Sequence, residues 1–311
     1  MLVVLMTACQ AQTVTPDPQI AARRQQERAM LPAVTTVQKW QQIGSISLAE
    51  NTAPSIIPLD NGDYRLFWNA PSLNGIGSAT TPDGLRFNAD EGARLINAPA
   101  GQPDCAIGNP SVIPVINGYR LYYQGQADHC NVAVTTLTTN SRILSAFSSD
   151  GTRFTRDPGI RVDVGDVTGL RSAGHGRVIQ MDNGSFRMYF TALLPDKNTT
   201  PYIMTATSID TLVWTVDTKP LLEGAHDPTA LQVENTIQLY VSYMTDNVLL
   251  LESTDGVTFK PTAWLEFYDT KNILITQMSD LDIIDVPDGS LVIYGSGTGT
   301  KGILSFKQAI E

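Results

Sequence analysis

An internal repeat of about fifty residues constrains this chain more than any other feature of its sequence. Each copy opens with a tight turn, usually Asn-Gly or Asp-Gly, between two runs in which apolar residues alternate. That pattern is the strongest short-range signal for a β-hairpin. A second turn and an aromatic residue follow, so each copy is expected to hold four antiparallel strands. The opening hairpins span residues 57–68, 115–123, 181–190, 233–241 and 286–294.

The fifth copy is cut short near the end of the chain, and its missing strand is expected near the beginning. Trp40 stands thirteen residues before Ala53, the same spacing that separates Trp214 from Asp227. Residues 37–48 should therefore form the outer strand of the last unit. Closed rings of four-stranded units are β-propellers. The sequence predicts an all-β fold, a five-bladed β-propeller whose N-terminal strand closes the last blade. A β-sandwich with coincidental spacing is the alternative.

The composition limits the classes of function. Hydrophobic residues make up 42% of the 311 residues and charged residues 17%, which is enough apolar material for a sizeable core. The formal net charge of −10 argues against a nucleic-acid partner, because binding to a phosphate backbone depends on clustered Lys and Arg. No apolar run approaches the ~20 residues that a membrane-spanning helix needs.

The first nine residues are mostly apolar and end in Thr7, Ala8 and Cys9. They resemble the end of a bacterial lipoprotein signal, although the usual basic segment is missing and the apolar run is short. The resemblance implies lipidation of Cys9 and a place in the bacterial cell envelope, lipid-anchored or secreted, with membrane contact only through the anchor. An ordinary start with a chance Cys is the alternative. Residues 10–36 are polar and predict a tether with at most a short helical turn, which leaves 37–311 as the propeller.

The two remaining cysteines, Cys105 and Cys130, make an even pair. In an exported protein such a pair predicts a disulfide. Cys105 precedes an inner strand and Cys130 follows a second strand, so both should lie on the face that carries the long, varied loops. Long loops on a rigid scaffold usually carry function. A bond between these cysteines would therefore fix two loops of the functional face.

The residues that start the innermost strands converge on the axis of a propeller. The repeat alignment puts Ala53, Asn109, His175, Asp227 and Asp280 at these positions. Apolar side chains would be less costly beside a dry axis, because a buried charge must be paired or hydrated. Four polar residues out of five therefore predict a wet, functional or ion-holding centre.

The repeat, the ring closure and the inner-strand carboxylates resemble the five-bladed propeller glycosidases of arabinanase, β-xylosidase and invertase type, over residues 37–311. The resemblance implies a carbohydrate substrate and glycosyl hydrolysis or transfer by carboxylates at the central funnel. That chemistry needs two carboxyl groups on either side of a glycosidic bond, one protonated and one ionised. Asp227, which precedes Pro228 as in the superfamily, and Asp280 are the expected catalytic pair.

The sequence departs from this family at two positions. Arabinanase-type relatives carry a catalytic Asp at the first inner strand, where this chain has Ala53, and Asn109 at the second cannot act as a base. These departures favour the alternative function, a noncatalytic glycan- or ligand-binding surface propeller built on a degenerate family member. A sialidase would need a sixth blade and an arginine triad. A structural interaction lipoprotein stays open as a third function.

Sugar-binding roles are expected for His175, Asn109 and Arg171, which can donate hydrogen bonds to hydroxyl groups. Trp68 and Tyr123 end second strands near the long-loop face and could stack on sugar rings. Packing between blades is the alternative for the two aromatic residues, and a hydrogen-bonded core position is the alternative for His175.

No cofactor and no metal site are expected, because the three His and the Cys residues lack the spacing of a zinc site. An ion or a water molecule beside His175 on the axis is left open. His226 precedes Asp227 in the chain, and neighbouring residues of a regular strand face opposite sides. A direct contact between these two side chains is therefore not expected.

Overall fold

The computed structural model describes residues 17–46, 52–128, 130, 134, 137–194, 200–297 and 302–309. Nearly all regular structure in these ranges is β-strand, with one α-helix, α1 (Pro18–Arg28), and one short 3-10 helix, η1 (Pro71–Leu73). None of the helices described is long and apolar enough to cross a membrane. The expected lipidation site, Cys9, and the rest of residues 1–9 lie outside the described residues.

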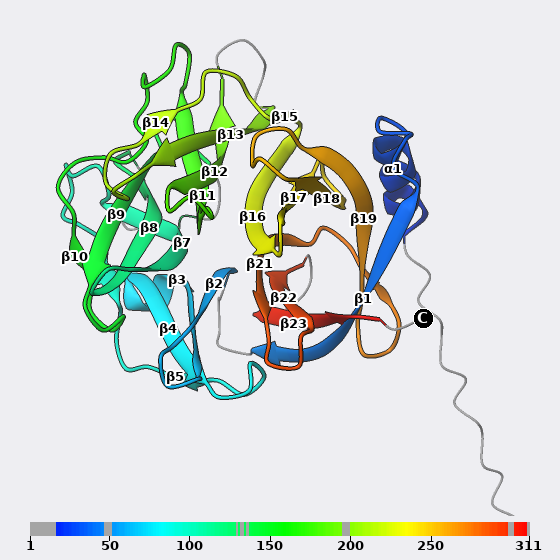
Figure 1. Cartoon of the computed structure of the whole chain (residues 1–311), viewed down its shortest axis with the longest axis horizontal. Helices are drawn as coiled ribbons and strands as arrows, with labels where there is room; N and C mark the ends of the chain where they lie inside the picture. Colours follow the sequence, from blue (N-terminus) through cyan, green and yellow to red (C-terminus); the bar gives the residue numbers. More distant parts are fainter. Residues whose placement is uncertain are drawn as a thin grey trace, which may run out of the picture.

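The described strands form four sheets, which we describe as five groups of antiparallel strands, called blades 1 to 5 in chain order (Figure 1). Blade 1 contains β2 (Thr52–Pro58), β3 (Tyr64–Ala70), β4 (Gly75–Thr81), β5 (Asn88–Ala89) and β6 (Leu95–Ile96). Blade 2 contains β7 (Ala106–Val115), β8 (Gly118–Gln126), β9 (Arg142–Ser148) and β10 (Thr155–Arg156). Blade 3 contains β11 (Ser172–Gln180), β12 (Phe186–Leu193), β13 (Pro201–Ser208), β14 (Thr215–Val216) and β15 (Leu222–Glu223).

The last two blades have longer outer strands. Blade 4 contains β16 (Ala225–Val233), β17 (Thr236–Tyr243), β18 (Asn247–Ser253), β19 (Lys260–Tyr268) and β20 (Leu274–Ile275). Blade 5 contains β21 (Ser279–Asp285), β22 (Leu291–Ser296), β23 (Ile303–Gln308) and β1 (Thr36–Ile46).

The first strands of the blades, β2, β7, β11, β16 and β21, surround one axis. Each contacts the next in chain order, and β21 contacts β2, so the ring closes. Apolar side chains fill the space between neighbouring blades, as where Ile57 and Phe67 of blade 1 join one cluster with Leu121 of blade 2. This arrangement confirms the all-β propeller expected from the repeat (Figure 1).

Strand β1 joins the two ends of the ring. It pairs antiparallel with β23, as the spacing of Trp40 predicts, and so closes the last blade. It also pairs in parallel with β19, the outer strand of blade 4, where Trp40 stands beside Phe267. The spacing of the repeat does not predict this second pairing. As a result, blades 4 and 5 form one nine-stranded sheet, whereas the other blades are separate sheets.

The segment expected to be a tether is folded in part onto blade 4. Asp17 accepts a hydrogen bond from Gln19 N at 2.9 Å and caps α1, which Pro18 starts. The buried carboxylate of Glu27 accepts hydrogen bonds from the backbone N–H of Thr245 (3.1 Å) and of Asp246 (3.2 Å). These residues lie in the turn between β17 and β18. Polar composition suggested a solvated linker, but here it supplies specific partners for this turn.

A repeated turn, on the face opposite the long loops, packs each of blades 1 to 4 against its neighbour. In blade 2, Gly151 N donates to Ser148 Oγ at 3.0 Å and Thr152 N donates to Asp150 Oδ1 at 2.8 Å. The aromatic residue after each turn meets an aromatic ring of the adjacent blade edge to face. The ring pairs are Phe154 with Phe67, Trp214 with Tyr122, Phe259 with Tyr189, and Phe87 with Tyr294.

Candidate functional site at the propeller axis

The five residues that the repeat places at the axis share one unusual backbone conformation. Ala53, Asn109, His175, Asp227 and Asp280 have φ values of 51°, 52°, 49°, 49° and 51°, in the left-handed region that non-glycine residues rarely adopt. Each lies in a β-bulge, where the pairing of the first and second strands shifts register. All five line one small cavity. The bulges therefore direct equivalent side chains of all the blades toward the axis.

His175 is the centre of this cluster. Its Nδ1 lies 2.6 Å from Oδ1 of Asp227 and 3.5 Å from Oδ1 of Asp280, and its side chain is 9% exposed. Burial alone would lower the pKa of His175, but the two carboxylates raise it to about 10. The imidazolium is therefore the stable form of the ring at neutral pH.

Asn109 approaches the other side of the imidazole ring. Its Nδ2 lies 3.0 Å from His175 Nε2, and the same amide contacts Gln124 and Asn69. Because an imidazolium has no acceptor nitrogen, the charged form requires the amide to present Oδ1 to Nε2. The protonation of His175 is thus coupled to the orientation of Asn109. Asn109 is 4% exposed and is held within this network rather than presented to a cleft.

Asp227 has a second histidine partner, which the sequence pattern did not predict. His226 Nδ1 lies 2.8 Å from Asp227 Oδ2, and His226 Nε2 lies 3.2 Å from the carbonyl oxygen of Met244. The expectation that the two side chains face apart was wrong, because the bulge between His226 and Thr229 interrupts the alternation of the strand. Burial favours the neutral acid, but His175 and His226 hold the pKa of Asp227 well below its usual value.

The axial cavity is small. It measures about 10 Å³ and is lined by the five axial residues together with Arg177, Pro228 and Leu281. This volume suits about one water molecule or ion. The ligand atoms of His175, Asp227 and Asp280 lie within 4.8 Å of one another, so these residues could together hold a cation in place of the proton on Nδ1. The space does not admit a sugar ring.

Arg177 closes the axis beside His175, and sequence reasoning missed it. Its guanidinium donates hydrogen bonds to the carbonyl oxygens of Pro110 at 2.5 Å, Pro54 at 2.6 Å and Leu281 at 3.4 Å. One buried side chain of blade 3 therefore ties together the inner strands of blades 1, 2 and 5. The signal that could have revealed it is a lone Arg two residues after an axial position, in a strand that contains no other Arg, Lys, Asp or Glu.

Asp282, two residues after Asp280, has a structural position. Its carboxylate accepts hydrogen bonds from Ile56 N at 2.7 Å and Thr229 Oγ1 at 3.0 Å, which join blade 5 to blades 1 and 4. Burial raises the pKa of Asp282 above its usual value, although the nearby Arg177 and the N–H of Ile56 oppose this. A raised pKa is what a general acid needs, but this carboxyl group is not part of the cavity lining.

The two aromatic residues expected to stack on sugars are buried in the structure. Trp68 is 5% exposed and belongs to the hydrophobic cluster between blades 1 and 5. Tyr123 is 1% exposed, and its hydroxyl donates to Asp104 Oδ2 at 3.0 Å. Packing between blades, which the sequence left as the alternative, accounts for both. Neither ring offers a free face to a ligand in this conformation.

Arg171 lies apart from the axial cluster, on the long-loop face. It is exposed and lines a pocket of about 370 Å³ formed by loops of blades 2 and 3. The other lining residues are Asp128, Leu137, Thr138, Thr139, Leu193 and Leu194. The structure therefore separates Arg171 from His175 and Asn109, which sequence reasoning had grouped as one sugar-binding set.

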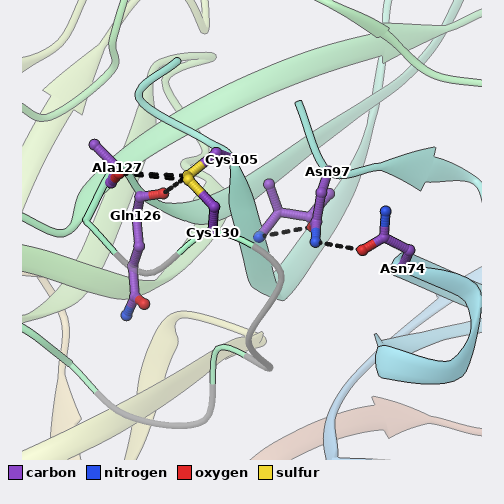
Figure 2. The surroundings of a disulfide bond; sticks show 7 residues. Asn74, Asn97, Cys105, Gln126, Ala127 and Cys130 are labelled. Carbon is purple, nitrogen blue, oxygen red and sulfur yellow. Dashed lines mark hydrogen bonds between the residues drawn. A yellow bond between two sulfur atoms is a disulfide. The ribbon is translucent and has the colours of Figure 1, made fainter. Parts of the chain in front are cut away.

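The expected disulfide between Cys105 and Cys130 is present. Figure 2 shows its sulfur atoms beside the carbonyl groups of Gln126, the last residue of β8, and Ala127, which follows it. The bond thus ties Cys130, two residues after Asp128 of the Arg171 pocket, to Cys105 at the start of blade 2.

Comparisons with known proteins identify the fold but no family at the level of sequence. No protein-family model matches the chain, and no curated protein matches it in sequence. Solved structures do match. A family 117 glycoside hydrolase from Zobellia galactanivorans has a TM-score of 0.65 at 13% identity, over 88% of this chain and 90% of that one. A thermostable family-43 glycoside hydrolase gives 0.62 at 12% identity, over 87% and 93%.

An endo-arabinase from Bacteroides thetaiotaomicron gives a TM-score of 0.59 at 13% identity, over 87% of this chain and 97% of that one. The resemblance to arabinanase- and xylosidase-type propellers that the repeat suggested is thus present in three dimensions, at low sequence identity. At this level of identity, the likeness shows that the chain has the β-propeller fold of these glycoside hydrolases.

Proposed function

We propose that this protein is a carbohydrate-binding β-propeller whose axial carboxylates do not catalyse glycosyl hydrolysis. The observation that carries the proposal is the pairing of Asp227 and Asp280 with His175 around a space of about 10 Å³. Hydrolysis needs two carboxyl groups roughly 5–5.5 Å or roughly 6.5–9.5 Å apart across a cleft that holds the sugar. In this chain both groups point at one buried imidazole. The first inner strand carries Ala53, 1% exposed, at the position where arabinanase-type relatives have a catalytic Asp, so a third carboxyl group is missing at the axis.

The proposed binding site is the Arg171 pocket on the long-loop face. Its volume of about 370 Å³ lies in the usual range for small-molecule sites. Arg171 supplies hydrogen-bond donors, Asp128 an acceptor, and Thr138 and Thr139 hydroxyl groups, a set that matches the hydroxyl pattern of a sugar. The solved structures with the same fold include an endo-arabinase and a xylan β-1,4-xylosidase, which supports pentose-containing glycans as first candidates.

A glycan panel tests this proposal by reading binding and released reducing sugar together. The parent protein should bind a glycan and release no sugar, and Arg171→Ala should weaken binding at least tenfold. Arg153→Ala is the matched control, because Arg153 is an exposed arginine on the opposite face. Binding that survives Arg171→Ala but not Arg153→Ala would contradict the assignment of the pocket.

Glycosyl hydrolysis or transfer at the axis is the second candidate. It is supported by the ionised state of Asp227, which suits a base or a nucleophile, and by the activities named for the solved structures with this fold. It requires Asp227 and Asp280 to separate from His175 so that the cavity admits a sugar. Sugar release by the parent protein that is lost in both Asp227→Asn and Asp280→Asn would establish it.

Export to the bacterial cell envelope is part of the proposal. The pairing of Cys105 with Cys130 supports an oxidising compartment, where disulfides persist. Lipidation of Cys9 would then attach the propeller to a membrane through the anchor alone, and the net charge of −10 speaks against a nucleic-acid partner. Cell fractionation tests the anchor, since Cys9→Ala should move the protein from the membrane fraction to the soluble fraction.

A further inference from the structure

We propose that a groove between blades 2 and 3 is a second carbohydrate-binding site, in which a sugar ring packs against Trp214. The groove measures about 600 Å³ and lies between residues 158–166 of blade 2 and residues 212–216 of blade 3. It shares no lining residue with the Arg171 pocket or with the axial cavity. The inference takes its ligand class from the proposed function, and its location rests on the observations below.

Trp214 differs from the other tryptophans of the chain. Trp40, Trp68 and Trp264 are 1%, 5% and 1% exposed, whereas Trp214 is half-buried and lines the groove. Its ring meets Tyr122 edge to face at 5.7 Å, and its Nε1 donates to the carbonyl oxygen of Thr211 at 3.2 Å. These contacts fix the indole on its inner side. The rest of the ring forms a rigid apolar wall, which suits the face of a sugar.

The repeat makes the size of Trp214 informative. The turns of blades 2 and 4 place Phe154 and Phe259 at the equivalent position, and each makes the same edge-to-face contact with its neighbouring blade. A Phe is therefore sufficient for the packing between blades. Trp214 carries one ring more than this packing requires, and it lines the groove.

Arg161 supplies a polar group at the same wall. It is 6% exposed, and its two terminal nitrogens donate to the carbonyl oxygens of Leu212 and Pro158, each at 2.5 Å. Its Nε has no hydrogen-bond partner within the described residues. No carboxylate forms an ion pair with Arg161 in the described part of the chain, so its charge is not neutralised by direct contact. Because Nε is itself buried in this conformation, the side chain has to turn toward the groove for a ligand to accept a hydrogen bond from it.

The remaining lining favours a sugar over a purely apolar or purely anionic ligand. Asp166 and Thr215 are exposed at the groove and add an acceptor and a hydroxyl group, while Val213 adds apolar surface. A sugar ring combines an apolar face with hydroxyl groups that both donate and accept. Neutral sugars and uronates share this chemistry, and a uronate would in addition place a carboxylate near Arg161.

Tryptophan fluorescence of the full chain tests the site, because Trp214 is the one half-buried tryptophan of the four. Titration with neutral arabino- and xylo-oligosaccharides, and separately with oligouronates, should shift the emission and reduce quenching by acrylamide. In Trp214→Phe the ligand-induced change should disappear while the thermal transition stays near that of the parent. Arg171→Ala should keep the change, which separates this site from the Arg171 pocket.

Substitutions at two exposed residues of one turn give a second test that does not alter the core. Val213 lines the groove and is 71% exposed, whereas Ile209 of the same turn is 88% exposed and does not line it. Val213→Glu should weaken the Trp214-reported affinity at least tenfold, and Ile209→Glu should leave it within twofold. A parent protein that binds glycan through Arg171 without any fluorescence change would overturn the second site and leave the proposed function standing. Equal effects of the two glutamates would overturn it as well.

Discussion

His175 Nδ1 lies 2.6 Å from Asp227 Oδ1, and the two residues hold equivalent positions in neighbouring blades. The same bulge and the same left-handed backbone conformation thus present a base in blade 3 and an acid in blade 4. Asp280 of blade 5 adds a second carboxylate at 3.5 Å. The repeat thus brings His175, Asp227 and Asp280, from three blades, into one buried ionic cluster. Replacing one member of such a cluster leaves the others uncompensated.

His175→Ala should therefore be strongly destabilising. It leaves the carboxylates of Asp227 and Asp280 in a nearly closed cavity without their shared cation. Breaking a buried ion pair in this way costs about 3–5 kcal/mol. Urea unfolding measures the loss. His226→Ala is the control, because the His226 side chain is 30% exposed and water can replace it beside Asp227, so its effect should be clearly smaller. Similar losses in both variants would contradict the central place of His175.

The cluster also predicts how stability depends on pH. The folded chain holds the His175 proton more tightly than the unfolded chain, with a pKa raised from 6.5 to about 10. The corresponding stabilisation is complete below about pH 6.5 and is lost as the pH rises through 10. Asp227 acts in the other direction. Its pKa is lowered from 3.8, so its contribution is present above pH 3.8 and is lost as the pH falls further.

Urea midpoints measured from pH 3 to pH 11 test this profile. Stability should be greatest between about pH 4 and pH 6.5 and should decline through the alkaline range. In His175→Gln, which cannot carry a charge, the alkaline decline should become shallower while the acid decline persists in part through His226. An unchanged alkaline slope in this variant would show that His175 isn't the group that titrates.

Arg177→Met should destabilise the ring without altering any charge in the exposed loops. The guanidinium serves carbonyl groups of Pro110, Pro54 and Leu281, and a thioether satisfies none of them. Each buried carbonyl left unpaired costs about 1–3 kcal/mol, and the partial access of water to the axis moderates the sum, so a total of about 3–5 kcal/mol is expected. Thermal unfolding checks this value. Arg153→Met, at an exposed position, should change stability by less than about 0.5 kcal/mol.

Glu27→Gln should loosen α1 from blade 4. The carboxylate accepts from Thr245 N, Asp246 N and Asn247 Nδ2, whereas an amide oxygen accepts less strongly and its NH₂ group would face these donors. Limited trypsin digestion reads the change, because Arg23, Arg24 and Arg28 lie in the helix. Cleavage there should accelerate about tenfold, which corresponds to about 1.4 kcal/mol. Gln25→Ala, on the exposed side of the same helix, should digest like the parent.

The axial positions could be predicted because the repeat itself encodes them. Five residues identified by spacing alone share one φ value within a few degrees and line one cavity. What spacing cannot give is the direction of a side chain at a bulge, and for that reason the contact between His226 and Asp227 was missed. Spacing also cannot distinguish an aromatic residue that packs between blades from one that binds a ligand. Trp68 and Tyr123 end strands near the correct face, yet neighbouring blades cover both.

Contacts between residues far apart in the chain were the other feature that could not be predicted from the sequence. Arg177 binds carbonyl groups of three other blades, and β1 pairs with β19 in addition to its predicted partner β23. Nothing near these residues in the sequence signals the Arg177 contacts or the pairing of β1 with β19. The docked helix α1 was hidden by its composition. Its polar residues read as a solvated linker because their partners, at 245–247 and Glu266, lie far along the chain.

The double pairing of β1 has a consequence for how the chain is made. Trp40 leaves the ribosome well before its partners Phe267 and Gln308. Until they emerge, both edges of this strand are unpaired and open to wrong partners. Once β1, β19 and β23 have all been made, β1 is hydrogen-bonded along both of its edges. A force applied to the N-terminal segment would then have to break the hydrogen bonds of β1 with both β19 and β23 before it reached blade 1.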